Sequence, residues 1–142
     1  MNAMVESLHA VPLFAELSRR DLKRLADSMQ ELSFPAGHQV VAEGKGGVGF
    51  FVILDGSARV TQGGEDRGQL TAGDYFGEMA LIDGDDRVAS IHAEGDLRCA
   101  VMSPWTFRPF VKEHPDVAWS LLTALVKRMR ATHAATTGAT AS

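Results

Sequence analysis

Short apolar runs separated by glycines fill the middle of the chain. Twelve of the 14 glycines lie between Gly37 and Gly84. Short strands punctuated by glycine turns are typical of an antiparallel sandwich or barrel. The two adjacent glycines in residues 62–65 predict a tight hairpin. The strands predicted in this segment are Gln39–Ala42, Phe50–Leu54, Ala58–Thr61 and Gln69–Thr71.

A second pair of strands follows the glycine-rich segment. Ala89, Ile91 and Ala93 alternate with polar neighbours, and the alternation resumes over residues 97–101 after a turn at residues 94–96. An apolar residue at every second position indicates a half-buried strand. Cys99 falls on the apolar side of its strand, so we expect it to be a buried, unreactive thiol.

Helices are predicted at both ends of the chain. Ser18 is a good N-cap, and an apolar stripe follows it at helical spacing. Pro104 predicts another helix start, and Pro109 is expected to break or kink that helix. A longer helix is predicted from Asp116 to Arg130 or slightly beyond, with basic residues that complement its dipole at the C-terminal end. The N-terminal stripe consists of Leu22, Leu25, Ala26 and Met29, and the basic residues are Lys127, Arg128 and Arg130.

This order of elements predicts an α+β fold. We expect an antiparallel β-roll, a jelly-roll-like sandwich of about eight strands, flanked by N-terminal helices and a C-terminal helix. Residues 1–133 are predicted to form one domain, and the small, polar residues 134–142 a flexible tail.

Composition excludes several classes of function. The chain has 142 residues and a net charge of −4, which disfavours direct binding to nucleic acid. Its single cysteine excludes an internal disulfide and a cysteine-based zinc site. The longest apolar run, Phe50–Leu54, is too short to cross a membrane, and the N-terminus does not resemble a secretory signal. We therefore expect a cytoplasmic protein.

The most informative segment for chemistry is residues 73–91. Gly77 lets the backbone approach a ligand closely, and a helix start after it would expose N–H groups to an anion. Arg87 could reach the same anion, since its planar guanidinium suits a phosphate. Glu78 fits poorly as a phosphate ligand but well as the acceptor for a sugar hydroxyl. Together these residues describe a site for a ribose phosphate.

Residues 76–81 (Phe-Gly-Glu-Met-Ala-Leu), followed by residues 87–90 (Arg-Val-Ala-Ser), resemble the phosphate-binding cassette of cyclic nucleotide-binding domains. These domains are the sensors of catabolite activator proteins, protein kinase A regulatory subunits and cyclic nucleotide-gated channels. The resemblance covers roughly residues 8–133. Further matching positions are Leu13–Phe14, Leu17–Ser18, Glu43–Gly44, Gly47 and residues 50–56.

The resemblance implies a role for each matching residue. Arg87 would hold the cyclic phosphate, and Glu78 would accept a hydrogen bond from the ribose 2′-OH. The backbone N–H groups of Gly77, Met79 and Ala80 would line the sugar and phosphate. Three further residues match positions near the base, and these are Val60, Leu70 and Thr132.

Two departures from the family pattern bear on the ligand. Val88 stands where many members carry Ser or Thr, whose hydroxyl bonds the phosphate and, in cGMP-selective members, the guanine. Valine offers only its backbone N–H, which favours cAMP over cGMP. The acidic residues Asp83, Asp85 and Asp86 could also compete with the phosphate for Arg87.

Each candidate also has a structural interpretation without a ligand. Arg87 could be a surface arginine paired with Asp86, and Glu78 a solvated helix residue. Val60 and Leu70 could be core residues, and Thr132 an exposed helix residue. The histidines show no metal-ligand spacing such as the His-x-His of cupin enzymes, and no nucleophile has a base beside it. We therefore expect neither a metal nor catalysis.

The prediction is a cyclic nucleotide-binding sensor, with cAMP as its ligand. By analogy with the family, binding would move the C-terminal helix and signal to an effector protein or to a homodimer formed through that helix. Leu121, Leu125 and Met129 would be core or dimer seam. One alternative is a β-roll that has lost nucleotide binding and acts as an interaction module. Another is the sensor portion of a CRP/FNR-type transcription regulator, although the Met1 start and the Ala/Thr tail favour a complete chain.

Overall fold

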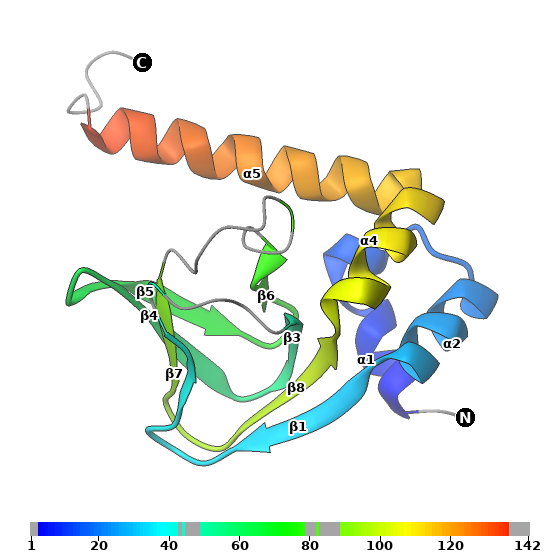
Figure 1. The fold of residues 1–142 in the computed structure, drawn as a ribbon, viewed down its shortest axis with the longest axis horizontal. Helices are drawn as coiled ribbons and strands as arrows, with labels where there is room; N and C mark the ends of the chain where they lie inside the picture. Colours follow the sequence, from blue (N-terminus) through cyan, green and yellow to red (C-terminus); the bar gives the residue numbers. More distant parts are fainter. Residues whose placement is uncertain (1–2, 43, 45–48, 79–81, 83–88, 137–142) are drawn as a thin grey trace.

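The computed structural model describes residues 3–42, 44, 49–78, 82 and 89–136. A β-roll occupies one side of the molecule, short helices cover its end, and one long helix crosses the top (Figure 1). The helices are α1 (Ala3–His9), the 3-10 turn η1 (Pro12–Phe14), α2 (Arg19–Ser28), α4 (Pro104–Glu113) and α5 (Pro115–Thr136). Among the described residues, no helix combines the length and apolar character needed to cross a membrane.

The strands form two four-stranded sheets in which every pairing is antiparallel. The first sheet has the order β1-β8-β3-β6 and the second the order β2-β7-β4-β5. This arrangement confirms the predicted α+β roll with flanking helices. The strands are β1 (Gln30–Phe34), β2 (Gln39–Val41), β3 (Phe50–Asp55), β4 (Ser57–Gln62), β5 (Glu65–Thr71), β6 (Tyr75–Phe76), β7 (Ser90–Ala93) and β8 (Leu97–Met102).

Strand β3 is buried on both faces, which explains why its sequence is continuously apolar. Phe50 and Val52 point into a core cluster shared with the helices. Phe51 and Ile53 point the other way, into the cluster between the two sheets. Its neighbour β8 divides its side chains in the same way. The two cores therefore meet at these two strands.

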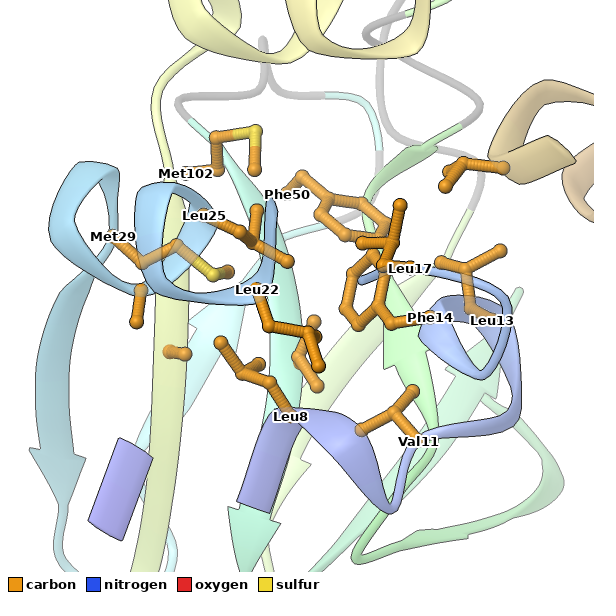
Figure 2. Close-up of a cluster of buried hydrophobic side chains, with 14 of the residues drawn as sticks. Leu8, Val11, Leu13, Phe14, Leu17, Leu22, Leu25, Met29, Phe50 and Met102 are labelled. Carbon is orange, nitrogen blue, oxygen red and sulfur yellow. The ribbon is translucent and has the colours of Figure 1, made fainter. Parts of the chain in front are cut away.

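The helical cluster joins α1, η1 and α2 to the first sheet (Figure 2). Leu8, Phe14 and Leu22 are fully buried in it, and the predicted apolar stripe of α2 supplies much of the rest. Phe107 of α4 packs on Phe50 with ring centroids 5.0 Å apart. Burial of several large side chains, each contributing about 1.5–3 kcal/mol, holds the helices on the roll.

Two local predictions are confirmed in detail. The Ser18 side chain accepts a hydrogen bond from the Asp21 N–H at 3.1 Å and so caps α2. Gly63 and Gly64 adopt φ angles of 59° and 80° and connect β4 to β5. Two successive residues with positive φ are what a two-residue hairpin with the right twist requires.

Other elements differ from the prediction. Strands β1 and β6 were not predicted, and β5 begins at Glu65 rather than Gln69. The break expected at Pro109 is wrong, because α4 continues through it to Glu113. Packing of α4 on the core, including the Phe14–Phe110 contact at 6.2 Å, offsets the hydrogen bond that the proline cannot donate.

Gly56, between β3 and β4, provides the first testable prediction. Its φ is 91°, and a Cβ there would overlap the carbonyl oxygen of Asp96. Gly73 has a similar φ of 94°, but a Cβ there would meet nothing within 4 Å. We expect Gly56→Ala to lower the free energy of unfolding by about 3 kcal/mol or more, and Gly73→Ala by about 1–2 kcal/mol. Urea unfolding of both variants measures the difference, and equal losses would contradict the steric argument.

Cys99 provides a second prediction. The residue is fully buried in β8, and burial raises the pKa of its thiol to about 12. We expect it to react with a thiol reagent at pH 8 only when the chain unfolds. Because the unfolded thiol loses its proton near pH 9 and the folded one does not, this group should make the free energy of unfolding fall as pH rises above about 9. Fast labelling of the folded chain would contradict both expectations.

Candidate functional site

The turn before β6 positions the chain segment that carries the candidate site. The Thr71 N–H donates to the Asp74 carboxylate at 2.8 Å, and the Asp74 N–H donates to the Thr71 carbonyl at 2.9 Å. Ile53 of β3 bonds to both sides of this turn, donating to the Asp74 carbonyl and accepting from the Gly73 N–H. The turn is therefore tied directly to the strand that is buried on both faces.

Strand β6 then leads the chain to Gly77 and Glu78. Phe76 stacks on Phe51 with ring centroids 4.8 Å apart, and Tyr75 packs on Phe50 at 5.5 Å. The two aromatic rings thus anchor β6 in both core clusters. Gly77 follows with a φ of 96°, a conformation that favours glycine. This backbone turn delivers the next residue, Glu78, to the interior.

Glu78 is a buried carboxylate with two unequal oxygens. Its exposed fraction is 3%. Oε1 lies 3.3 Å from the guanidinium of Arg128, which belongs to α5. Oε2 is buried and accepts no hydrogen bond in the described part of the chain. A buried carboxylate oxygen without a donor is costly, so Oε2 marks a place where a ligand hydroxyl would be stabilising.

The hydroxyl of Tyr75 interacts electrostatically with both Glu78 and Arg128. Burial, and secondarily the negative charge of Glu78, raises the pKa of its hydroxyl, while the positive charge of Arg128 acts in the opposite sense. The phenol therefore stays neutral well above physiological pH. Tyr75, Glu78 and Arg128 form one local group that joins β6 to α5.

The sequence did not single out Arg128 as a site residue. It was interpreted as part of a basic helix end that complements the dipole. The signal that could have found it is its position, because Arg128 lies seven residues after Leu121 and eleven after Val117, both of which are buried. These intervals put all three side chains on one face of a helix. The arginine therefore reaches Glu78 at the surface of the domain, although 52% of its side chain stays exposed to solvent.

The structure describes only some of the remaining predicted site residues. Val60 and Leu70 lie on the paired strands β4 and β5, and both pack against the cluster between the sheets. Thr132 lies in α5, but its side chain is outside the described part of the structure. Met79, Ala80, Arg87 and Val88 lie outside the described residues, as do the acidic residues Asp83, Asp85 and Asp86. Within the described residues, no group of His, Cys, Asp and Glu side chains could hold a metal ion.

The family model described as "Cyclic nucleotide-binding domain" matches residues 31–114, more than half of the 142-residue chain. The chain belongs to this family. The match confirms the resemblance that the cassette residues carry.

Relatives of known identity agree with this assignment. A cAMP-dependent protein kinase regulatory subunit of Mycosarcoma maydis is 39% identical in an alignment of 106 residues that covers 68% of this chain and 20% of the relative. The solved structure of cAMP-bound PfPKA-R has a TM-score of 0.80 and 25% identity, covering 89% of this chain and 43% of that chain. The Catabolite Activator Protein of Thermus thermophilus has a TM-score of 0.78 and 27% identity, covering 86% of this chain and 60% of that one. The cyclic nucleotide-binding domain thus spans about a fifth of the length of the curated relative.

The Glu78–Arg128 pair provides a third prediction. Arg128→Ala removes the cation from a buried carboxylate, and we expect a loss of about 1–2 kcal/mol in the free energy of unfolding, reduced by the 52% exposure of the arginine side chain. The same change in a Glu78→Gln background should cost less than about 0.5 kcal/mol, since a neutral amide needs no cation. Urea unfolding of the two single variants and the double variant gives the coupling energy.

A surface ion pair provides the matched control for this cycle. Arg19 bonds to Glu6 at 2.9 Å, with both side chains substantially exposed. Arg19→Ala should cost less than about 1 kcal/mol. Additive losses in the Glu78–Arg128 cycle would contradict the pairing.

Proposed function

We propose that this domain binds a cyclic nucleotide, with cAMP as its preferred ligand. The observation that carries the proposal is the Oε2 atom of Glu78, buried and without a hydrogen-bond donor among the described residues. A ribose 2′-OH donates the hydrogen bond that this oxygen lacks. The family match and the similarity to a cAMP-bound regulatory subunit support the same ligand class.

The sugar and the C-terminal helix share one carboxylate in this proposal. Oε1 stays with Arg128, and Oε2 receives the ribose hydroxyl. Binding of a ligand hydroxyl at Oε2 therefore changes the environment of a residue that α5 contacts directly. A ligand can shift α5 only by binding one of its positions more tightly than another, and the shared carboxylate is a contact through which that difference can act.

The phosphate half of the site rests on the sequence. Arg87 is proposed to pair with the cyclic phosphate, assisted by backbone N–H groups of Gly77, Met79 and Ala80. Val88 offers no side-chain hydroxyl, which is the basis for preferring cAMP to cGMP. Val60 and Leu70 supply apolar surface beside the base, and Thr132 is the candidate residue of α5 for contact with it.

The proposed output is a movement of α5 that a separate effector protein recognises. The relatives with this similarity are regulatory subunits, in which the matched region is one part of a longer chain. A regulatory role for this domain follows from that likeness, together with the contact between Glu78 and α5.

Nucleotide binding provides the fourth prediction. The full chain, unfolded and refolded to remove any nucleotide carried from the host, is titrated calorimetrically with cAMP and with cGMP. We expect saturable binding of cAMP and weaker binding of cGMP. Arg87→Ala should cost about 2–5 kcal/mol of binding free energy. Glu78→Ala should cost about 1.5–3 kcal/mol, because a hydrogen bond to a charged acceptor is lost.

Glu31 is the matched control for Glu78. It is an exposed carboxylate of β1 that pairs with Arg98 at 3.3 Å on the surface. Glu31→Ala should leave nucleotide affinity unchanged. If the folded wild-type chain binds neither nucleotide, the sensor proposal fails and the alternative of a non-binding interaction module takes its place.

A further inference from the structure

The second sheet carries a network of polar side chains that the proposed nucleotide site does not use. Arg59 of β4 donates to Oε2 of Glu94 from both Nε and Nη2, at 3.2 and 2.9 Å. The side-chain amide of Gln69 on β5 donates to the other oxygen, Oε1, at 2.7 Å. Arg59 also reaches the Asp66 carboxylate through Nη1, at 3.4 Å. We call these four residues the outer network.

The outer network is more constrained than an ordinary surface ion pair. Each carboxylate oxygen of Glu94 has its own donor, and the two donors come from different strands. The Glu94 N–H also donates to the Ser57 carbonyl at 3.1 Å, which ties the backbone after β7 to β4. The hydrogen bond from Gln69, more than any other contact, lowers the pKa of the Glu94 carboxyl, so the group is charged at neutral pH. The network therefore holds β4, β5 and the end of β7 in one arrangement.

The strand register places the outer network directly opposite the residues proposed to face the base. Arg59 pairs with Gln69 across the two strands, and Val60 and Leu70 are the next residue on each strand. Successive side chains of a strand point to opposite faces of the sheet. Val60 and Leu70 accordingly lie on the inner face, where both are only partly buried against the cluster between the sheets. A change in how β4 and β5 are held on the outer face therefore changes the spacing of these two side chains.

A bulge explains why the backbone ladder alone does not fix that spacing. The register of β4 and β5 shifts directly after Val60, whose partner is Gly68 with a φ of 123°. A bulge interrupts the ladder and leaves a residue unpaired. Asp66 lies beyond this interruption, and its Oδ1 accepts a hydrogen bond from the Gly68 N–H at 2.9 Å. Because Arg59 contacts both Asp66 and Glu94, side chains of the outer network span the interrupted part of the ladder.

We propose that Arg59, Gln69 and Glu94 are positioning residues for base selection. Acting through β4 and β5, they fix the spacing of Val60 and Leu70, and this spacing sets which base fits against the sheet. The inference rests on the proposed binding of a cyclic nucleotide. The network does not touch the nucleotide, since it lies on the opposite face of the sheet. Loosening it should leave the ribose and phosphate contacts in place and reduce the discrimination between bases.

Base selectivity provides the fifth prediction. The full chain, freed of nucleotide, is titrated calorimetrically with cAMP, cGMP and cCMP, which share the ribose phosphate and differ in the base. We expect the wild type to bind cAMP most tightly, and Arg59→Met to reduce its preference for cAMP over each of the others by about fivefold or more. A merely structural loss would lower all three affinities by the same factor, because only the folded fraction binds, and would leave their ratios unchanged.

Two further variants test whether the network acts as a unit. Glu94→Gln keeps the size of the side chain but removes its charge, and it should reduce the same preference for cAMP. The double variant Arg59→Met/Glu94→Gln should lose no more selectivity than Arg59→Met alone, because the two residues belong to one network. Glu78→Ala should lower the affinity for all three nucleotides by one common factor, since its proposed contact is with the shared ribose.

Arg98 is the matched control for Arg59. It forms a cross-strand ion pair with Glu31 at 3.3 Å in the first sheet, and its side chain is 40% exposed against 38% for Arg59. Arg98→Met should leave the affinity ratios unchanged, and circular dichroism melting checks that every variant is folded.

The outcomes separate this inference from the proposed function. Wild-type affinity ratios in Arg59→Met, or an equal change in Arg98→Met, would overturn the positioning role while nucleotide binding stands. A wild type that binds the three nucleotides with equal affinity would overturn it as well. A folded wild type that binds none of them would overturn the proposed function, and this inference with it.

Discussion

The burial of β3 on both faces is the constraint on which the rest of the structure depends. Phe50 and Val52 pack in the helical core, and Phe51 and Ile53 pack in the core between the sheets. Neither core can therefore form without this strand. The same strand bonds through Ile53 to the turn at Gly73 and Asp74, and pairs with β6. The position of Gly77 and Glu78 is thus set by the two hydrophobic cores together. A rigid support of this kind is what a binding residue needs, because its geometry is then fixed before the ligand arrives.

The burial of Glu78 carries a cost in free energy that its ion pair offsets only in part. A carboxylate that is 3% exposed loses most of its hydration, and Arg128, its ion-pair partner within the described residues, is half in solvent. The pairing compensates this cost only in part, since Oε2 has no donor among the described residues. Folding stability alone would be better served by an apolar residue at this position. A buried, half-satisfied carboxylate is therefore more readily explained by a ligand than by stability, and the family assignment identifies the class of ligand to test first.

Elements whose local chemistry determines their shape could be predicted from the sequence. Ser18 precedes an apolar stripe at helical spacing and therefore predicts a helix start, and Gly63–Gly64 between two strand-like segments predicts a hairpin. Strand β1 was missed because Glu31 and Ser33 face solvent and only Leu32 and Phe34 are half-buried, so its apolar pattern is weak. Pro109 misled the prediction because tertiary packing of Phe107 and Phe110 outweighs a local helix breaker. The Glu78–Arg128 contact joins residues 50 positions apart, and only the placement of α5 over β6 brings them together.

Helix α5 has two faces in different surroundings. One face holds Arg128 against the carboxylate proposed to receive the ribose, and the other leaves Trp119, Leu122, Val126 and Met129 exposed. A helix moves as a unit, so a shift that alters the Arg128 contact also moves Trp119 and Met129. A partner that contacts the exposed face of α5 would therefore respond to a change at Glu78, and linkage requires that its binding change nucleotide affinity by the same factor as the nucleotide changes the affinity for that partner.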